Sequence, residues 1–291
     1  MTVRIVTDSA CDVPQEVCDE LGIEIVPLSI RFGDREFQDR VELTAEVFWQ
    51  ELAKASVLPE TAAPSVGAFE EVFRRLYEDG ASGIVCINLS EKMSATMQSA
   101  RVASKSLDGL CPIEVVDSMS ASMGIGMQVM HAAELARDGA DVPTIVAAIE
   151  DVRNRTKVLF TVDTLEYLKK GGRIGGAQAL LGSALSIKPV LHTQNGQVGT
   201  LRKVRTRSKA LQFIIDEAKA ADVERICVLH TMPTDLDARL GRSAAACVES
   251  GYPGPLGLSS VPRWVHRGRA NCVSSTATRT SCVWSKAPHW Q

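Results

Sequence analysis

Aromatic side chains are scarce in this chain, at 5% of 291 residues, and the net charge is only −3. The scarcity of aromatics argues against a stacking surface for single-stranded nucleic acid, and the charge argues against a strongly basic face. No apolar run reaches the roughly 20 residues of a membrane span, and the N-terminus lacks the apolar stretch of a signal peptide. We expect no nucleic-acid partner, no stable membrane insertion and at most transient contact with a membrane.

Cysteine pairs of the kind that bind zinc or perform redox chemistry are also missing. The chain has eight cysteines, and none of them forms a C-x-x-C motif. Scattered thiols without an export signal are typical of the reducing cytoplasm. We therefore expect a cytoplasmic protein with no metal site.

Several common enzyme signatures are absent as well. The sequence contains no Gly-Lys pair, which excludes a P-loop, and no G-x-S-x-G motif, which excludes the usual nucleophile elbow. The Gly124-Ile125-Gly126 segment lacks the third glycine of a dinucleotide fingerprint and does not directly follow a strand. These absences leave hydroxyl side chains at predicted strand ends as the main candidates for a site, and we expect no cofactor.

Acidic residues disappear near the C-terminus. Residues 251–291 hold no Asp or Glu and five Lys or Arg, whereas residues 1–250 hold all 35 acidic residues. Three of the four tryptophans lie in this tail, which is unusual for a disordered segment. No helical or strand period continues through residues 262–269. A disordered basic tail is one interpretation; we favour a second, that the reading frame changes near residue 251.

The first part of the body, residues 1–155, alternates between short apolar segments and amphipathic ones. This alternation predicts an α/β domain with a doubly wound, mostly parallel sheet. The wholly apolar segment Gly83–Asn88 is typical of a strand covered by helices on both faces. Strands are predicted over Val3–Thr7, Ile23–Phe32, Arg35–Phe37, Gly83–Asn88 and Ile113–Asp117, and helices near 13–21, 44–54, 67–78, 96–106, 121–137 and 143–153.

The pattern changes after about residue 156, and residues 156–250 predict a second, α+β domain. Asn195-Gly196 is the turn of a predicted hairpin between Lys188–Thr193 and Val198–Val204. Further strands are predicted over Val158–Val162 and Arg225–His230, and helices near 164–169, 177–184, 206–220 and 235–249.

Hydroxyl and carboxylate side chains follow several predicted strands of the first domain. Asp8-Ser9 ends the first strand, Ser90–Thr96 follows Gly83–Asn88, and Asp117-Ser118 ends the next strand. Ligands of open α/β sheets bind beyond the carboxyl ends of the strands. Ser94 lies just before a predicted helix, where a hydroxyl and free backbone amides suit a carboxylate or phosphate. The alternative is that Ser94 is a plain N-cap.

Five segments together resemble the DegV family. Thr7-Asp8-Ser9-Ala10-Cys11-Asp12 is similar to its T-D-S-x-x-D signature, and the most specific match is to its L-x-Y-L-x-K-G-G-R-I stretch. The segments are residues 6–12, Thr61–Ser65, residues 89–100, Leu165–Ile174 and Arg202–Arg207, so the resemblance covers residues 3 to about 249 in the right order.

The resemblance implies two α/β domains with a long-chain fatty acid buried between them in an apolar tunnel. It implies that Thr61 and Ser94 hold the carboxylate, and that a partner subunit of a fatty acid kinase makes the acyl phosphate. Ser9, Arg173 and Arg202 are then expected near the head group or at the contact with the kinase. The chain itself would not be an enzyme.

Three departures from the family pattern bear on affinity. Ala62 and Ala63 replace polar residues of the usual motif, and Lys92 and Ala95 replace small or glycine positions around Ser94. The usual C-terminal G-P-V-I-G-x-H-x-G-P-G segment, whose histidine helps to hold the carboxylate, has no counterpart, and His266 is a poor match. We expect weak lipid binding as a result.

Two other functions remain open from the residues alone. One is a small-molecule hydrolase or phosphotransferase that uses Asp8, Ser9 and Ser94, although a serine nucleophile needs a positioned base that the sequence does not identify. The other is a structural or regulatory protein with an incidental lipid.

Overall fold

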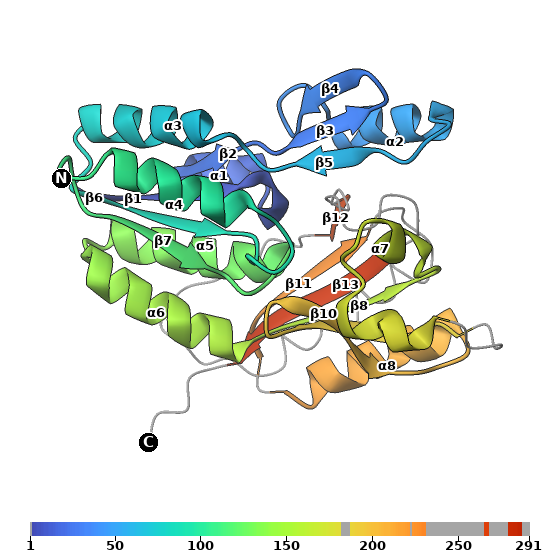
Figure 1. Ribbon diagram of the computed structural model, residues 1–291. Helices are drawn as coiled ribbons and strands as arrows, with labels where there is room; N and C mark the ends of the chain where they lie inside the picture. The colour runs from blue at the N-terminus through green and yellow to red at the C-terminus, as the bar shows by residue number, and fades with distance from the viewer. Residues whose placement is uncertain (1, 182–186, 222, 231–264, 268–278, 287–291) are drawn as a thin grey trace. The chain divides into compact units, whose positions relative to one another are not determined.

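The computed structural model describes residues 2–181, 187–221, 223–230, 265–267 and 279–286 (Figure 1). It divides into two compact units. The first takes in the described part of Met1–Asn154 together with Gln194–Gln197, and the second takes in the remaining described residues from Arg155 onward.

A four-stranded parallel sheet forms the centre of the first unit. Its strands are β1 (Val3–Asp8), β2 (Ile23–Val26), β6 (Gly83–Asn88) and β7 (Ile113–Asp117), in the order β2-β1-β6-β7. All three strand pairs are parallel. Every residue of β6 is buried, as its apolar sequence predicts for a strand with both faces covered. The α/β fold class is confirmed.

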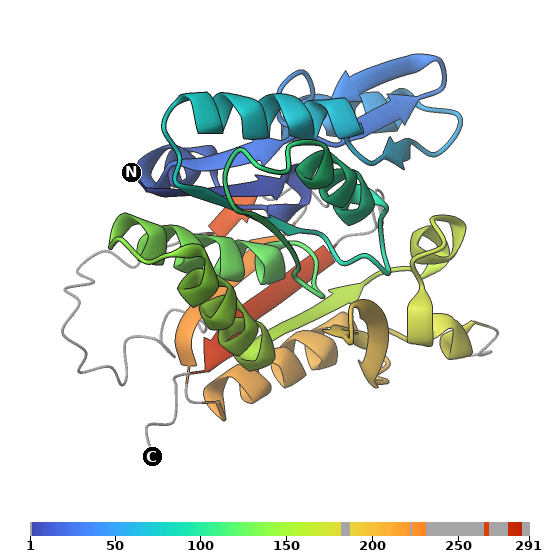
Figure 2. The ribbon, with the colours of Figure 1, turned by 60° about the vertical axis from the view of Figure 1, so that its left-hand side comes forward.

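Helices cover both faces of this sheet (Figures 1 and 2). On one face α3 (Val66–Glu78) packs against α4 (Thr96–Ser106), and on the other α5 (Met123–Arg137) contacts β1 and α1 (Gln15–Leu21). The helix α6 (Val142–Arg155) follows α5 in the chain. Phe69 and Phe73 of α3 are fully buried against Ile84 and Cys86 of β6. Burial of an aromatic side chain stabilises the fold by about 1.5–3 kcal/mol, so α3 is a principal source of this core.

A small antiparallel sheet is inserted between β2 and α3. Its strands β4 (Arg35–Gln38), β3 (Ser29–Phe32) and β5 (Glu60–Ala62) pair in that order, and α2 (Ala45–Lys54) lies between β4 and β5 in the chain. Ile30, Phe32, Leu43 and Phe48 form its core. The sequence predicted no strand at Glu60–Ala62, and this was wrong, because Thr61 pairs with Ile30 of β3.

The second unit is built on a six-stranded sheet. Its described elements are β8 (Thr156–Val162), α7 (Glu166–Lys170), the 3-10 helix η2 (Gly175–Leu180), β9 (Val190–Gln194), β10 (Gln197–Arg202), α8 (Arg207–Lys219), β11 (Val223–His230), β12 (Val265–Arg267) and β13 (Arg279–Lys286). The strand order is β10-β9-β8-β13-β11-β12. The pairs β9–β8, β8–β13 and β13–β11 are antiparallel, and β11–β12 is parallel. Helix α8 packs on β8 and β13, with Leu211 and Ile214 buried against Leu159 and Val190.

Part of the atypical C-terminal segment belongs to this sheet. Strand β13 lies between β8 and β11, and β12 lies beside β11. The absence of a strand period across residues 262–269 was therefore misleading for 265–267. The expected helix at 177–184 is a 3-10 helix that ends at Leu180, with 182–186 outside the described residues. The expected helix at 235–249 also lies outside them.

Charge is divided unevenly along the chain. Residues 1–154 contain 26 Asp and Glu and 12 Lys and Arg, whereas residues 155–291 contain 9 Asp and Glu and 20 Lys and Arg.

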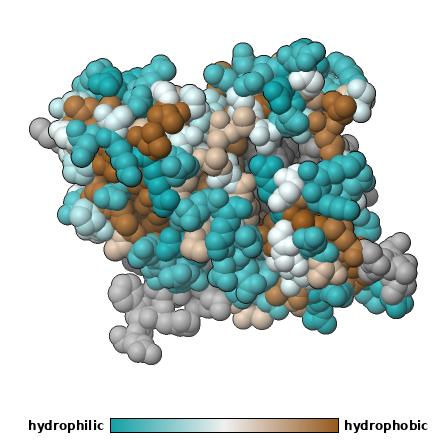
Figure 3. All heavy atoms as spheres, viewed as in Figure 1, coloured by the Kyte–Doolittle hydropathy of each residue, from teal (hydrophilic) through white to brown (hydrophobic). Residues whose placement is uncertain are grey.

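Hydrophilic residues dominate the face in Figure 3, with hydrophobic ones in separate groups. Among the residues that the structure describes, no helix combines the length and the apolar character needed to cross a membrane.

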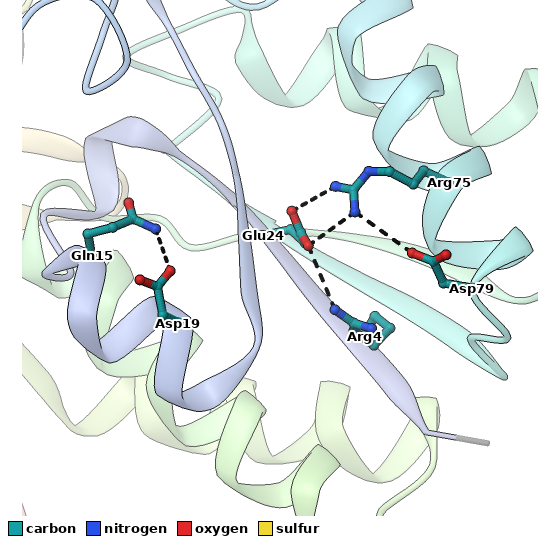
Figure 4. A network of polar contacts seen from close by, with 6 residues as sticks. All are labelled: Arg4, Gln15, Asp19, Glu24, Arg75 and Asp79. Carbon is teal, nitrogen blue, oxygen red and sulfur yellow. Dashed lines mark hydrogen bonds and ion pairs between the residues drawn. The ribbon is translucent and has the colours of Figure 1, made fainter.

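Ion pairs on the first unit join α3 to the sheet. Glu24 of β2 lies 2.8 Å from the guanidinium of Arg75 and 3.7 Å from that of Arg4 (Figure 4). Exposed pairs of this kind contribute about 0–1 kcal/mol each, so they add little to the buried core.

Candidate functional site

The strand order places a topological switch point in the first unit. From β1 the chain moves to β2 on one side, and it later returns to β6 on the other side of β1. The connections above the carboxyl ends of β1 and β6 therefore run in opposite directions, and this is where open α/β sheets bind ligands. Asp8 ends β1 and Asn88 ends β6, so the polar strand ends predicted from the sequence adjoin this point.

Asp8 is fully buried and accepts three hydrogen bonds. Its Oδ1 accepts from the Ala10 amide at 3.0 Å, and its Oδ2 accepts from the Leu89 amide at 2.8 Å and from Asn88 Nδ2 at 3.2 Å. Burial raises the pKa of the Asp8 carboxyl above its ordinary value of 3.8, and the three donors oppose that rise. Asp8 therefore connects the end of β1 to the segment that follows β6.

Ser94 lies on the turn that joins this segment to α4. The carbonyl of Ser90 accepts hydrogen bonds from the amides of Met93 and Ser94, at 2.9 and 3.1 Å. The Ser94 hydroxyl accepts from the Thr96 amide at 3.3 Å and lies 2.9 Å from the Thr96 hydroxyl. The alternative interpretation of Ser94 as a plain N-cap was wrong, because Ala95 holds the N-cap position of α4. Ser94 is half-buried.

A second serine segment, residues 118–122, lies beside the first; of its serines only Ser118 was predicted from the sequence, and Ser120 and Ser122 were missed. The Ser90 amide donates to the carbonyl of Ser120 at 3.0 Å, and Ser118 and Ser120 are both buried. Ser122 has a φ of +59° and its hydroxyl donates to Asp12 Oδ2 at 2.5 Å. Positive φ at a non-glycine residue is strained and is common at binding sites. The hydroxyls alternating through residues 118–122, just after β7, are the signal that could have revealed this segment.

Thr61 and Ser9 are connected through the inserted sheet. The Ser9 hydroxyl is fully buried and accepts from the Leu28 amide at 3.1 Å, immediately before β3. Strand β3 in turn pairs with β5, which carries Thr61. Thr61 is half-buried, and within the described part of the chain its hydroxyl has no hydrogen-bond partner from the protein. Thr61 therefore retains its capacity to bind a ligand.

Arg173 and Arg202 lie in the second unit. Arg173 is half-buried after α7, where its guanidinium donates to the Gly171 carbonyl at 2.7 Å. Arg202 is exposed at the end of β10, with its guanidinium carbon 4.7 Å from the centre of the Phe213 ring. Their expected place near a head group or a partner stays a prediction.

The geometry gives little support to a hydrolase built on Asp8, Ser9 and Ser94. The Asp8 oxygens accept hydrogen bonds from the Ala10 and Leu89 amides and from Asn88. The Ser94 hydroxyl lies beside the Thr96 hydroxyl, which is not a base at neutral pH. Among the described residues, no group of three His, Cys, Asp or Glu side chains is suited to hold a metal ion. What the arrangement offers is neutral hydroxyl donors, which suit the binding of an anion.

Comparison with known proteins decides the family. The model of the DegV family, described as uncharacterised proteins, matches residues 2–261. This chain belongs to the DegV family. The match extends into the first residues of the acid-free tail.

Curated DegV relatives align over most of the chain. A DegV domain-containing protein of Streptomyces coelicolor is 40% identical over 237 residues, which is 80% of this chain and 83% of the relative. Another, from Halalkalibacterium halodurans, is 38% identical over the same shares of the two chains.

Solved DegV structures align with nearly the whole length of this chain. A DegV family protein from Thermus thermophilus, reported for its fatty acid binding, has a TM-score of 0.83 at 32% identity and covers 98% of this chain and 100% of its own. DegV of Bacillus subtilis, reported as a fatty acid binding protein, has a TM-score of 0.82 at 26% identity and covers 99% and 100%.

Proposed function

We propose that this DegV protein is a lipid-binding protein and not an enzyme, and that it holds one long-chain fatty acid by its carboxylate at Thr61 and Ser94. The observation that carries the proposal is the likeness to the Thermus thermophilus protein, which extends over 98% of this chain. The half-buried hydroxyls of Thr61 and Ser94 support it from the side of the geometry.

The energetics agree with such a ligand. Each buried methylene of an acyl chain contributes about 0.8 kcal/mol, so a C16 chain supplies ample driving force. A carboxylate is costly to desolvate unless donors replace its water. The Thr61 hydroxyl, the Ser94 hydroxyl and the amides at the start of α4 provide those donors.

We further propose that the protein acts in the cytoplasm and presents the carboxylate to a partner kinase, which makes the acyl phosphate. Ser9, Arg173 and Arg202 would then lie near the head group or the kinase contact. The test is to mix palmitate-loaded protein with ATP and a bacterial fatty acid kinase subunit, and to measure acyl phosphate by mass spectrometry. Product that forms equally without this protein would contradict the presenting role.

Native and then denaturing mass spectrometry of the purified protein tests the binding itself. We expect a released C14–C18 fatty acid at near one per chain, and about tenfold weaker palmitate binding in Ser94→Ala from the loss of one hydrogen bond to a charged group. Ser104→Ala is the matched control, because this hydroxyl lies on the same helix and donates to the Arg101 carbonyl. A folded protein that never binds palmitate would refute the proposal.

The missing C-terminal histidine segment predicts weaker binding than in other family members. Grafting a family-like C-terminus onto this chain should then lower the dissociation constant for palmitate. Unchanged affinity after the graft would show that the segment is dispensable here.

A further inference from the structure

Two consecutive residues at the end of β1 are joined to the two proposed carboxylate-binding hydroxyls by separate hydrogen-bonded connections. We infer that Asp8 and Ser9 are positioning residues: Asp8 sets the place of Ser94, and Ser9 sets the place of Thr61. This inference rests on the proposed fatty acid site, and it gives the two buried residues a role that needs no contact with the ligand.

The connection from Asp8 runs through the segment after β6. Its Oδ2 accepts the Leu89 amide at 2.8 Å, and the next residue, Ser90, accepts the amides of Met93 and Ser94. A buried carboxylate is a strong acceptor for backbone amides, so it fixes this turn better than a neutral group would. Both oxygens of Asp8 are acceptors, and asparagine keeps only one, so Asp8→Asn should loosen the turn that holds the Ser94 hydroxyl.

The connection from Ser9 runs through the inserted sheet. The Ser9 hydroxyl accepts the Leu28 amide at 3.1 Å, and β3 starts at the next residue. In the three-stranded sheet β5 is an edge strand that pairs with β3, with Thr61 opposite Ile30. Thr61 therefore takes its position from β3, and the start of β3 is attached to β1 by Ser9.

Crossed double-mutant cycles on delipidated full-length protein test this division of roles, with palmitate affinity as the measurement. Asp8→Asn and Ser9→Ala should each weaken binding about three- to tenfold. The Asp8→Asn effect should shrink to within about twofold in a Ser94→Ala background and persist in a Thr61→Ala background. Ser9→Ala should show the opposite pattern.

A loss of stability alone cannot produce that crossed pattern. Asp141→Ala provides the control, because Asp141 accepts the Thr144 amide at the start of α6, and its loss should lower the melting temperature without changing palmitate affinity. If Asp8→Asn does not fold, Asp8→Ser replaces it, because the shorter side chain also removes the acceptor of the Leu89 amide and adds no volume to the buried site.

Two failures are distinguishable. If Ser94→Ala and Thr61→Ala weaken binding but the effects of Asp8→Asn and Ser9→Ala are the same in both backgrounds, the positioning inference is overturned and the site stands. If Ser94→Ala and Thr61→Ala leave palmitate affinity unchanged, the proposed site and the inference are both overturned.

Discussion

The two units of this protein differ in the type of their sheet, in their net charge and in the parts of the chain that supply their strands. The first has a parallel sheet, a net charge of −14 over residues 1–154, and buried polar groups at its strand ends. The second has a mostly antiparallel sheet, a net charge of +11 over residues 155–291, and a central strand taken from the C-terminal segment. The first unit thus holds the proposed carboxylate ligands, while the second depends on residues far along the chain.

Core truncations should show whether the units unfold separately. Phe73→Ala removes a fully buried ring from the first unit and should cost about 3–5 kcal/mol, and Leu211→Ala in the second should cost about 2–5. Hydrogen exchange read by mass spectrometry should show loss of protection in β1 and β6 for the first variant and in β8 and β9 for the second. Equal loss in both units from either variant would mean that they unfold as one.

The central place of β13 predicts that proline is not tolerated there. Val283 pairs with Val158 on one side and Cys227 on the other, so Val283→Pro should cost about 3 kcal/mol or more. Exchange protection should fall in β8 and β11 and stay in β6. Arg279→Pro, at the first residue of the strand, should be mild by comparison. Equal effects of the two prolines would show that β13 is not a central strand.

Whether the sequence predicted a strand depended on how local its determinants are. Strand β6 is a continuous apolar run bounded by turns, so local pattern was enough to find it. Strand β5 has three residues, and its pairing with β3, about 30 residues earlier, leaves no local trace. Strand β13 lies where the composition looks atypical, and only its partners β8 and β11 make it a strand.

The candidate site shows the same limit. Ser94 and Asp8 were found because they follow predicted strands. The bond from Leu89 to Asp8 spans 81 residues, so the positioning role of Asp8 could not be inferred from sequence. Whether the reading frame changes near residue 251 stays a prediction, which resequencing the gene would check.

Helix caps offer a smaller comparison between the units. Ser65 caps α3 by accepting the Ala68 amide, and Thr206 caps α8 by accepting the Lys209 amide. Replacing either with alanine should cost about 0.5–2 kcal/mol of unfolding free energy, measured by urea denaturation. The Ser65→Ala effect should appear only in the first unit and the Thr206→Ala effect only in the second. A shift in both units from one cap would argue for coupling.

The smallest expected difference is in the response to pH. Burial raises the pKa of Asp8 above 3.8 in the first unit, and burial with the nearby Lys157 charge lowers the pKa of His192 below 6.5 in the second. Both shifts favour the neutral form. The Asp8 contribution to stability is complete below pH 3.8 and is lost as the pH rises through its folded pKa.

The His192 contribution has the opposite sign, being complete above pH 6.5 and lost as the pH falls through its folded pKa. As the pH falls from 7 to 5, the second unit should therefore lose more protection against hydrogen exchange than the first unit. The comparison is made after correction for the intrinsic exchange rate. His192→Gln should remove that excess loss, because glutamine does not titrate. An excess loss that survives in His192→Gln would assign it to another group of the second unit.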